Sequence, residues 1–382
     1  MSSIQFPTPA GTDAGRWCPD GTGSGYHVAT SEKIIDKIKR NAETGKPFVS
    51  FEYFPPRTAE GVANLYDRIA RMASQEPLFV DFTWGAGGST CELTLELCTT
   101  VKAKYGLDVN MHMTCTNQAV EKVDLGLLGA IKGGIRNICA LRGDPPLGQD
   151  KWEAEEGGFS CALDLIKHIR KKYGDYFGIS VSGYPEGHPD VIKPVSELGR
   201  SLSARELKRV MTKADGTQCV CSDEAYVKEM EYLKAKVDAG GEVIITQLFY
   251  DVEVFTQFAQ DCKEYGITAP ILPGIMVIQA YGGFKRMAGF CMTRVPEELA
   301  KKMEELKDDA EGVKAFGIEY GAQTCQTLLD RGICQGLHFY TLNLEKSTQT
   351  IMSKLGLLKG TVGSKAESEN TFAGTLINTV MA

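Results

Sequence analysis

The sequence of 382 residues predicts a closed barrel of eight parallel strands surrounded by helices, the (β/α)8 or TIM barrel class of the α/β folds. Short apolar runs alternate with longer amphipathic stretches, and eight such cycles follow one another. The alternative with the same alternation is a doubly wound open sheet, which carries a glycine fingerprint after its first strand. Here that position holds Pro55 and Pro56. The sequence therefore favours the barrel.

Each predicted strand is an apolar run of strand length that is rich in β-branched or aromatic residues and precedes a helical pattern. The eight runs are Phe48 to Phe54, Phe79 to Trp84, Val109 to Cys115, Asn137 to Gly143, Gly178 to Tyr184, Val243 to Phe249, Pro270 to Met276 and Gly336 to Leu342. A helix is expected before the first run, over Ser31 to Thr44 with Ser31 as its N-cap. Another helix is expected over Ala225 to Ala239.

The pattern assigns residues 29–358 to a single barrel domain. Residues 1–28 are rich in Gly, Ser, Thr and Pro and are expected to form a flexible N-terminal arm, whereas residues 359–382 are expected to form a short C-terminal tail. Residues 189–223 are polar and longer than an ordinary connection between a strand and a helix. They are therefore predicted to be a surface insertion.

The composition argues against several classes of protein. A net charge of -7 without a basic arm argues against nucleic acid or an anionic membrane as the main partner. The chain has no signal-peptide pattern and no apolar run near the ~18 residues of a membrane span, so a cytoplasmic protein is expected. The twelve cysteines and five histidines lack the spacing of a disulfide framework or a zinc site, and no metal site is expected.

Glu52 is a carboxylate inside an otherwise apolar strand that ends at a double proline. Because side chains alternate along a strand, Val49, Phe51 and Tyr53 share one face, and Glu52 lies on the opposite face with Ser50. If the apolar face packs under helices, the face with Glu52 looks into the barrel. Two interpretations remain open at this point: a charge at a strand end, solvated or paired with a nearby Arg, and a catalytic acid.

Polar side chains also occur at most of the other predicted strand ends, where a barrel concentrates its function. They are Asp81, Thr83, His112, Thr114, Arg142, Asp144, Tyr184, His188, Thr246, Gln247, Tyr340, Thr341 and Asn343. Arg142-Gly143-Asp144 could bind a phosphate or form a surface ion pair across a turn. Taken alone, His112 fits a core histidine and Lys236 a solvated charge.

Six ordered motifs resemble the methylenetetrahydrofolate reductase family, in its eukaryotic form, between Pro47 and Leu358. They are Ser50-Phe51-Glu52-Tyr53-Phe54-Pro55-Pro56-Arg57, Met111-His112-Met113-Thr114-Cys115, Ala140-Leu141-Arg142-Gly143-Asp144, Gly183-Tyr184-Pro185-Glu186-Gly187-His188-Pro189, Ile245-Thr246-Gln247-Leu248-Phe249 and His338-Phe339-Tyr340-Thr341-Leu342-Asn343. The resemblance implies an FAD-dependent (β/α)8 barrel that reduces 5,10-methylenetetrahydrofolate to 5-methyltetrahydrofolate by ping-pong transfer, with NADPH or NADH as reductant. This reaction supplies methyl groups for methionine synthesis.

The resemblance also implies roles for individual residues. Glu52 would be the general acid that assists ring opening at N10 of the folate, Asp144 would face the pterin, and Gln247 would hydrogen-bond the pterin edge. Met287 would contact the folate or the nicotinamide. The implied contacts of the flavin cofactor are Thr83, His112, Arg142, Gly143, Asp144, Tyr184, His188, Glu229 and Lys236. Glu229 stands where bacterial members carry Asp.

The partners implied by the resemblance are the folate, the nicotinamide nucleotide and further copies of the chain, in a dimer or tetramer. No motif distinguishes NADPH from NADH. Many eukaryotic members carry a regulatory domain that binds S-adenosylmethionine, and it is expected to be missing here unless the chain is a fragment. Two further hypotheses compete with the reductase. One is a non-catalytic relative that binds folate or flavin, and the other is a phosphate-binding aldolase, whose Schiff-base Lys no predicted strand end provides.

Overall fold

The computed structural model describes residues 31–85, 90–115, 118–144 and 157–359. The predicted N-terminal arm, and the predicted tail apart from Lys359, lie outside these residues. Eight parallel strands close into a barrel in the order β1-β11-β10-β9-β5-β4-β3-β2, which confirms the predicted fold class. The strands are β1 (Phe48–Tyr53), β2 (Val80–Phe82), β3 (Val109–Thr114), β4 (Asn137–Leu141), β5 (Gly178–Gly183), β9 (Val243–Leu248), β10 (Ile271–Met276) and β11 (Gly336–Tyr340).

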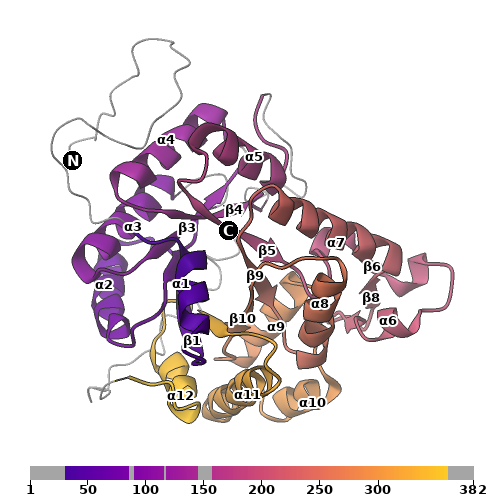
Figure 1. Cartoon of the computed structure of the whole chain (residues 1–382). Coiled ribbons are helices and arrows are strands. Elements are labelled where there is room, and N and C mark those ends of the chain that lie inside the picture. The colour runs from indigo at the N-terminus through magenta and orange to yellow at the C-terminus, as the bar shows by residue number, and fades with distance from the viewer. Residues whose placement is uncertain (1–30, 86–89, 116–117, 145–156, 360–382) are drawn as a thin grey trace, which may run out of the picture.

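Helices surround this ring of strands (Figure 1). They are α1 (Ile34–Ala42), α2 (Ala59–Ala73), α3 (Cys91–Tyr105), α4 (Val120–Lys132), α5 (Ala162–Tyr173), α7 (Asp223–Asp238), α8 (Val252–Glu264), α9 (Tyr281–Phe290), α10 (Glu297–Glu305), α11 (Ala310–Asp330) and α12 (Lys346–Lys354). None of the helices in the described ranges is long and apolar enough to cross a membrane.

The first and last barrel strands, β1 and β11, close the ring. Phe48 pairs with Gly336 at one end of this contact, and Glu52 pairs with Tyr340 at the other. An open sheet would leave both outer strands as edges, so this pairing excludes the doubly wound alternative. Closure also brings residues from the two ends of the chain side by side at the carboxyl-terminal rim, where active sites of such barrels lie.

The alternation predicted for β1 is confirmed. Phe51 and Tyr53 are buried in the core between the barrel and its helices, together with Leu65 and Ile69 of α2. On the opposite face, the hydroxyl of Ser50 lies 2.8 Å from Nδ1 of His338 on β11. The face that carries Ser50 and Glu52 therefore looks into the barrel.

Helix α1 covers the amino-terminal end of the barrel. Its residues Ile34 and Ile38 join an apolar cluster with Phe48 and Val243, which begin β1 and β9. The predicted role of Ser31 as N-cap is wrong, because α1 begins at Ile34 and the Ser31 hydroxyl instead donates to Asp108 at 2.6 Å. The backbone N–H of Ile34 donates to the side chain of Asn137 at 2.8 Å, which ties α1 to the start of β4.

The segment between β5 and α7 folds into a small antiparallel sheet in the order β6-β8-β7. Its elements are η2 (Pro189–Val191), β6 (Ile192–Pro194), η3 (Val195–Glu197), α6 (Ala204–Leu207), β7 (Met211–Thr212) and β8 (Gln218–Cys221). Gly187 packs against Cys221 so closely that a Cβ on the glycine would lie 2.7 Å from the sulfur. The small sheet therefore holds the loop after β5 from one side.

Candidate active site

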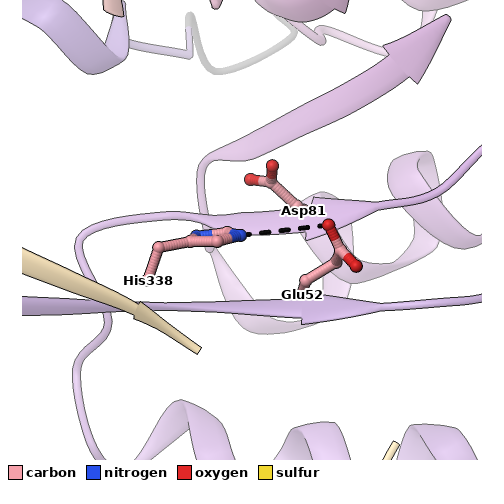
Figure 2. Close-up of side chains that lie close together, drawn as sticks. All are labelled: Glu52, Asp81 and His338. Atoms are coloured by element: carbon pink, nitrogen blue, oxygen red, sulfur yellow. Dashed lines mark ion pairs between the residues drawn. The ribbon is translucent and has the colours of Figure 1, made fainter. Parts of the chain in front are cut away.

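Glu52 lies inside the mouth of the barrel beside two buried histidines. Its Oε2 is 3.7 Å from Nε2 of His112 on β3 and 3.9 Å from Nε2 of His338 on β11. In Figure 2, Glu52, Asp81 and His338 point toward one another from three different strands. The described ion pairs join Glu52 to histidines of the barrel and not to Arg57, so the environment is that of an interior carboxylate.

A polar network below Glu52 fixes the position of His112. Oδ2 of the fully buried Asp81 lies 2.9 Å from Nε2 of His112 and accepts a hydrogen bond from Asn110 at 3.0 Å. Burial favours the neutral imidazole, but the hydrogen bond with Asp81 and the charges of Glu52 and Asp81 outweigh burial and raise the pKa of His112. The cationic form of His112 is therefore stabilised next to Glu52.

Two polar atoms of this network have no hydrogen-bond partner within the described residues. They are Oδ1 of Asp81 and Nε2 of His338, and both side chains are fully buried. Leaving buried polar groups unpaired is costly, so this interior is built to exchange hydrogen bonds with a water or a ligand group. One ligand atom from each of Glu52, Asp81 and His338 also lies within 4.8 Å of the others, an arrangement that could hold a cation. The sequence spacing could not reveal this group because each residue belongs to a different strand.

The end of β1 is held in place by the segment that follows β11. The hydroxyl of Thr341 donates to the carbonyl of Glu52 at 2.6 Å, and the Asn343 side chain bonds both backbone groups of Phe54, at 3.0 and 2.9 Å. Leu342 and Asn343 adopt positive φ angles of 52° and 58°, which are uncommon for residues other than glycine. This turn fixes the backbone of Glu52 at the barrel mouth.

A second cluster lies at the carboxyl ends of β4 and β5. The guanidinium of Arg142 bonds Asp190 at 2.8 Å, and Nδ1 of His188 lies 3.4 Å from the same carboxylate. Burial, together with the charge of Arg142, outweighs the charge of Asp190 and lowers the pKa of His188 to about 4. His188 is therefore neutral at physiological pH. Gly143, between Arg142 and Asp144, has a φ of 97° that favours glycine.

Lys236 belongs to the same cluster, although a helix lysine is ordinarily solvated. It is only 3% exposed, and its ammonium donates to the carbonyl of Ser182 at 2.7 Å. Burial lowers the pKa of Lys236 to about 8, and the opposing charge of Glu229 on the same helix limits the shift. A lysine that is buried away from solvent but can still carry a positive charge is suited to bind an anionic group.

A third group forms an apolar pocket beside the rim of β10 and β11. Met287 is buried on α9 and lines the pocket. The other lining residues are Tyr250, Met276, Val277, Ile278, Gln279, Ala280, Gly283, Phe284, Leu342 and Leu344. Gln247, the second-to-last residue of β9, is a partly exposed amide, and its side-chain oxygen accepts from the N–H of Leu248 at 2.8 Å. The described residues that line this pocket are mostly apolar, and none of them is charged.

Comparison with known proteins identifies the family of the chain. The family model for methylenetetrahydrofolate reductase matches residues 37–356. The chain belongs to the methylenetetrahydrofolate reductase family. It is 49% identical over 326 residues to methylenetetrahydrofolate reductase (NADH) 1 of Arabidopsis thaliana, which covers 85% of this chain and 51% of that protein. Methylenetetrahydrofolate reductase 2 of Saccharomyces cerevisiae is 42% identical, over 85% of this chain and 50% of the yeast protein.

This member of the reductase family spans about half the length of these plant and yeast relatives. The 5,10-methylenetetrahydrofolate reductase of Escherichia coli is 33% identical, and the match covers 83% of this chain and 93% of that shorter protein. Among solved structures, an uncharacterized protein from Clostridium thermocellum, described as binding two copies of 5-methyl-5,6,7,8-tetrahydrofolic acid, has a TM-score of 0.51. It is 13% identical over 84% of this chain and 96% of its own, so the likeness concerns the fold alone.

The predicted site residues of this family member fall into the three groups described above. Glu52 and His112 share the barrel interior, and Thr83 follows β2 on the same rim. Arg142, Tyr184, His188, Glu229 and Lys236 form the second cluster, with Asp144 close enough to interact electrostatically with Arg142. Met287 lies apart, in the apolar pocket.

Two residues that complete the interior were given no role by the family resemblance, although Asp81 was among the polar side chains expected at the strand ends. Asp81 and His338 share the inward face with Glu52. The alternation of side chains that predicted an inward direction for Glu52 could have indicated inward-facing residues on other strands. Asn110 and His112 alternate in the same way on β3, and so do His338 and Tyr340 on β11. Their partners could not be predicted, since each contact crosses between strands that are distant in sequence.

Replacing Asp81 with Asn should lower the pKa of His112, because the substitution removes the carboxylate that stabilises the imidazolium. The measurement is an NMR titration of the histidine side chains. His168 provides the control, since it lies 2.8 Å from Asp124 and not near Asp81. A titration of His112 that is the same in both proteins would show that Asp81 does not control its charge.

Proposed function

We propose that the chain reduces 5,10-methylenetetrahydrofolate to 5-methyltetrahydrofolate, with FAD as bound cofactor and NADPH or NADH as reductant. The observation that carries the proposal is the interior position of Glu52, held at the barrel mouth between His112 and His338. Membership in the family supports the substrate, and the match along 93% of the E. coli relative supports a reaction that needs only this barrel.

Glu52 is suited to deliver a proton to N10 of the folate. Its backbone is fixed by Thr341 and Asn343, and its carboxylate lies inside the barrel near His112 and His338. Opening of the five-membered ring requires that N10 accept a proton as its bond to the bridging carbon breaks, and a positioned carboxylic acid supplies this proton. Nε2 of His112 lies 3.7 Å from this carboxylate, so the imidazole can return the proton to Glu52 after turnover.

The second cluster fits a flavin dinucleotide. FAD, when bound, accepts a hydride from the nicotinamide and passes it to the folate. The buried ammonium of Lys236 and the guanidinium of Arg142 would hold its diphosphate, and Glu229 is available for a ribose hydroxyl. This arrangement explains why a cation is kept in a dry position that is otherwise costly. Neutral His188 and the adjacent ring of Tyr184 would contact the cofactor without adding charge.

The apolar pocket next to Met287 is suited to a flat ring system. We infer that folate and nicotinamide take turns there, which ping-pong transfer allows because the first product leaves before the second substrate binds. Gln247 would donate to the pterin edge through its free amide N–H groups, since its oxygen is engaged by the backbone of Leu248. Asp144, which is exposed beside the second cluster, would face the pterin from the opposite side.

A non-catalytic flavin- or folate-binding protein is the second candidate. It would need the cationic cluster of Arg142 and Lys236 but would have no use for a fixed carboxylate in the barrel mouth. The three hydrogen bonds from Thr341 and Asn343 that hold the Glu52–Phe54 backbone therefore favour the enzyme.

Replacing Glu52 with Gln should lower folate reduction by about 10²- to 10⁴-fold, because the amide has a similar shape but cannot donate an acidic proton. Oxidation of NADH or NADPH with a quinone acceptor should continue, since this half-reaction needs no acid at N10. Glu60→Gln, on the exposed start of α2, is the matched control. Both activities are followed by nucleotide absorbance. Undiminished folate turnover in Glu52→Gln would contradict the role of this residue.

The affinity for FAD should fall as the pH rises above about 8. Lys236 has a pKa of about 8 without a bound anion. A diphosphate would raise this pKa, so binding takes up a proton above that pH and the affinity decreases by at most about tenfold per pH unit. Quenching of FAD fluorescence measures the dissociation constant. In Lys236→Met the affinity should be lower and should lose this pH dependence, whereas Lys234→Met, on the exposed side of α7, should match the wild type. An identical pH dependence in Lys236→Met would contradict the assignment.

A further inference from the structure

We propose that Glu186 is a positioning residue that joins the loop after β5 to the carboxyl end of α9, and thereby holds the apolar pocket next to the second cluster. The inference rests on the proposed function only for the identity of the ligands that enter the pocket. Glu186 lies between Tyr184 and His188 in sequence, and it is 3% exposed, which is unusual for a glutamate.

Glu186 contacts residues that lie more than 100 positions later in the sequence. Its Oε1 accepts a hydrogen bond of 2.6 Å from the hydroxyl of Thr293 and another of 3.3 Å from the backbone N–H of Arg294. Both donors follow α9 directly. Two bonds that converge on one buried carboxyl oxygen connect the loop after β5 to the segment after α9.

The end of α9 is shaped to present these donors. Met292 has a positive φ of 50°, its N–H bonds the carbonyl of Gly289, and the N–H of Thr293 bonds the carbonyl of Ala288. This is the Schellman arrangement, which usually has glycine at the position of Met292. The turn directs the chain toward Glu186, while Met287 and Phe284 of the same helix line the pocket.

The neighbours of Glu186 are fixed on both sides. The guanidinium of Arg294 donates to Asp251, after β9, and to the carbonyl of Val210 in the small sheet region, each at 2.8 Å. Gly187, with a φ of 99°, packs on Cys221 of β8. The loop after β5 is held by its contact with β8. A shift of α9 relative to Glu186 therefore changes the shape of the apolar pocket and leaves this loop in place.

The charge of Glu186 provides a distinctive test of this connection. Burial raises the pKa of Glu186 to about 7, against its bonds with Thr293 and Arg294, and Asp251 adds to the rise. The guanidinium of Arg294 is engaged by Asp251, and burial keeps the thiol of Cys291 neutral by raising its pKa to about 12. In a state where α9 has moved away, Glu186 would have an ordinary pKa near 4.5. The docked state therefore binds the proton more tightly, so docking weakens as the pH rises from about 4.5 to about 7 and is independent of this group at higher pH.

The experiment compares the wild type with Glu186→Gln, Glu186→Ala and the surface control Glu197→Ala, all as the FAD-loaded full chain. Hydrogen–deuterium exchange of α9 is measured from about pH 5 to about pH 8 after correction for the intrinsic rate, together with KM and kcat for NADH and methylenetetrahydrofolate. In the wild type, exchange and KM should rise between about pH 5 and pH 7, by at most about tenfold per unit, and should level off above pH 7, where Glu186 is ionised in both states. Glu186→Gln keeps the acceptor oxygen and should remove this rise, whereas Glu186→Ala should raise KM about tenfold at every pH with a smaller effect on kcat.

The outcomes separate this inference from the proposed function. If the chain shows no folate activity but α9 exchange follows Glu186 as described, the function fails and the connection stands. If Glu186→Gln retains the pH dependence of the wild type, or Glu186→Ala leaves both α9 exchange and KM unchanged, the connection is overturned. Behaviour of Glu197→Ala like that of Glu186→Ala would also overturn it, because the effect would then not be specific to this contact.

Discussion

The pairing of β1 with β11 is the constraint on which the rest of the structure depends. It sets Glu52 opposite Tyr340 and brings His338 to the inner face of the barrel, so that residues almost 290 positions apart share one interior. The turn after β11 then holds the backbone of β1 through Thr341 and Asn343. A carboxylate with this support keeps its position without the freedom that an exposed side chain would have.

Two different electrostatic environments lie on different sides of the barrel mouth. One is a network of carboxylates and histidines, and the other contains two buried or partly buried cations. On the side of β1 to β3, carboxylates and histidines share protons in a buried network, with unpaired atoms at Asp81 and His338. On the side of β4, β5 and α7, the cations Arg142 and Lys236 stand near two carboxylates, and burial keeps His188 neutral. The first environment suits proton transfer at a substrate, and the second suits an anionic cofactor. The apolar pocket of α9 adds a surface for flat rings between them.

The fold was predictable because it depends on local patterns. Each of the eight predicted strands is found within two residues of its expected start, and the inward direction of Glu52 followed from the alternation along β1. The beginning of α1 was mispredicted because the hydroxyl of Ser31 bonds Asp108, a contact across 77 residues that no local rule contains. For the same reason, the network of Asp81, His112 and His338 and the contact of Glu186 with Thr293 appear only when the barrel is closed.

The central claim is that this barrel carries both halves of a flavin-dependent folate reduction. Double-mixing stopped-flow spectroscopy under anaerobic conditions tests it most directly, because it follows the bound flavin through each half in turn. The account predicts that NADH, NADPH or both bleach the flavin absorption and that methylenetetrahydrofolate, added in the second mix, restores it. A chain that binds no FAD, or whose reduced flavin stays bleached in the presence of the folate, would contradict the account.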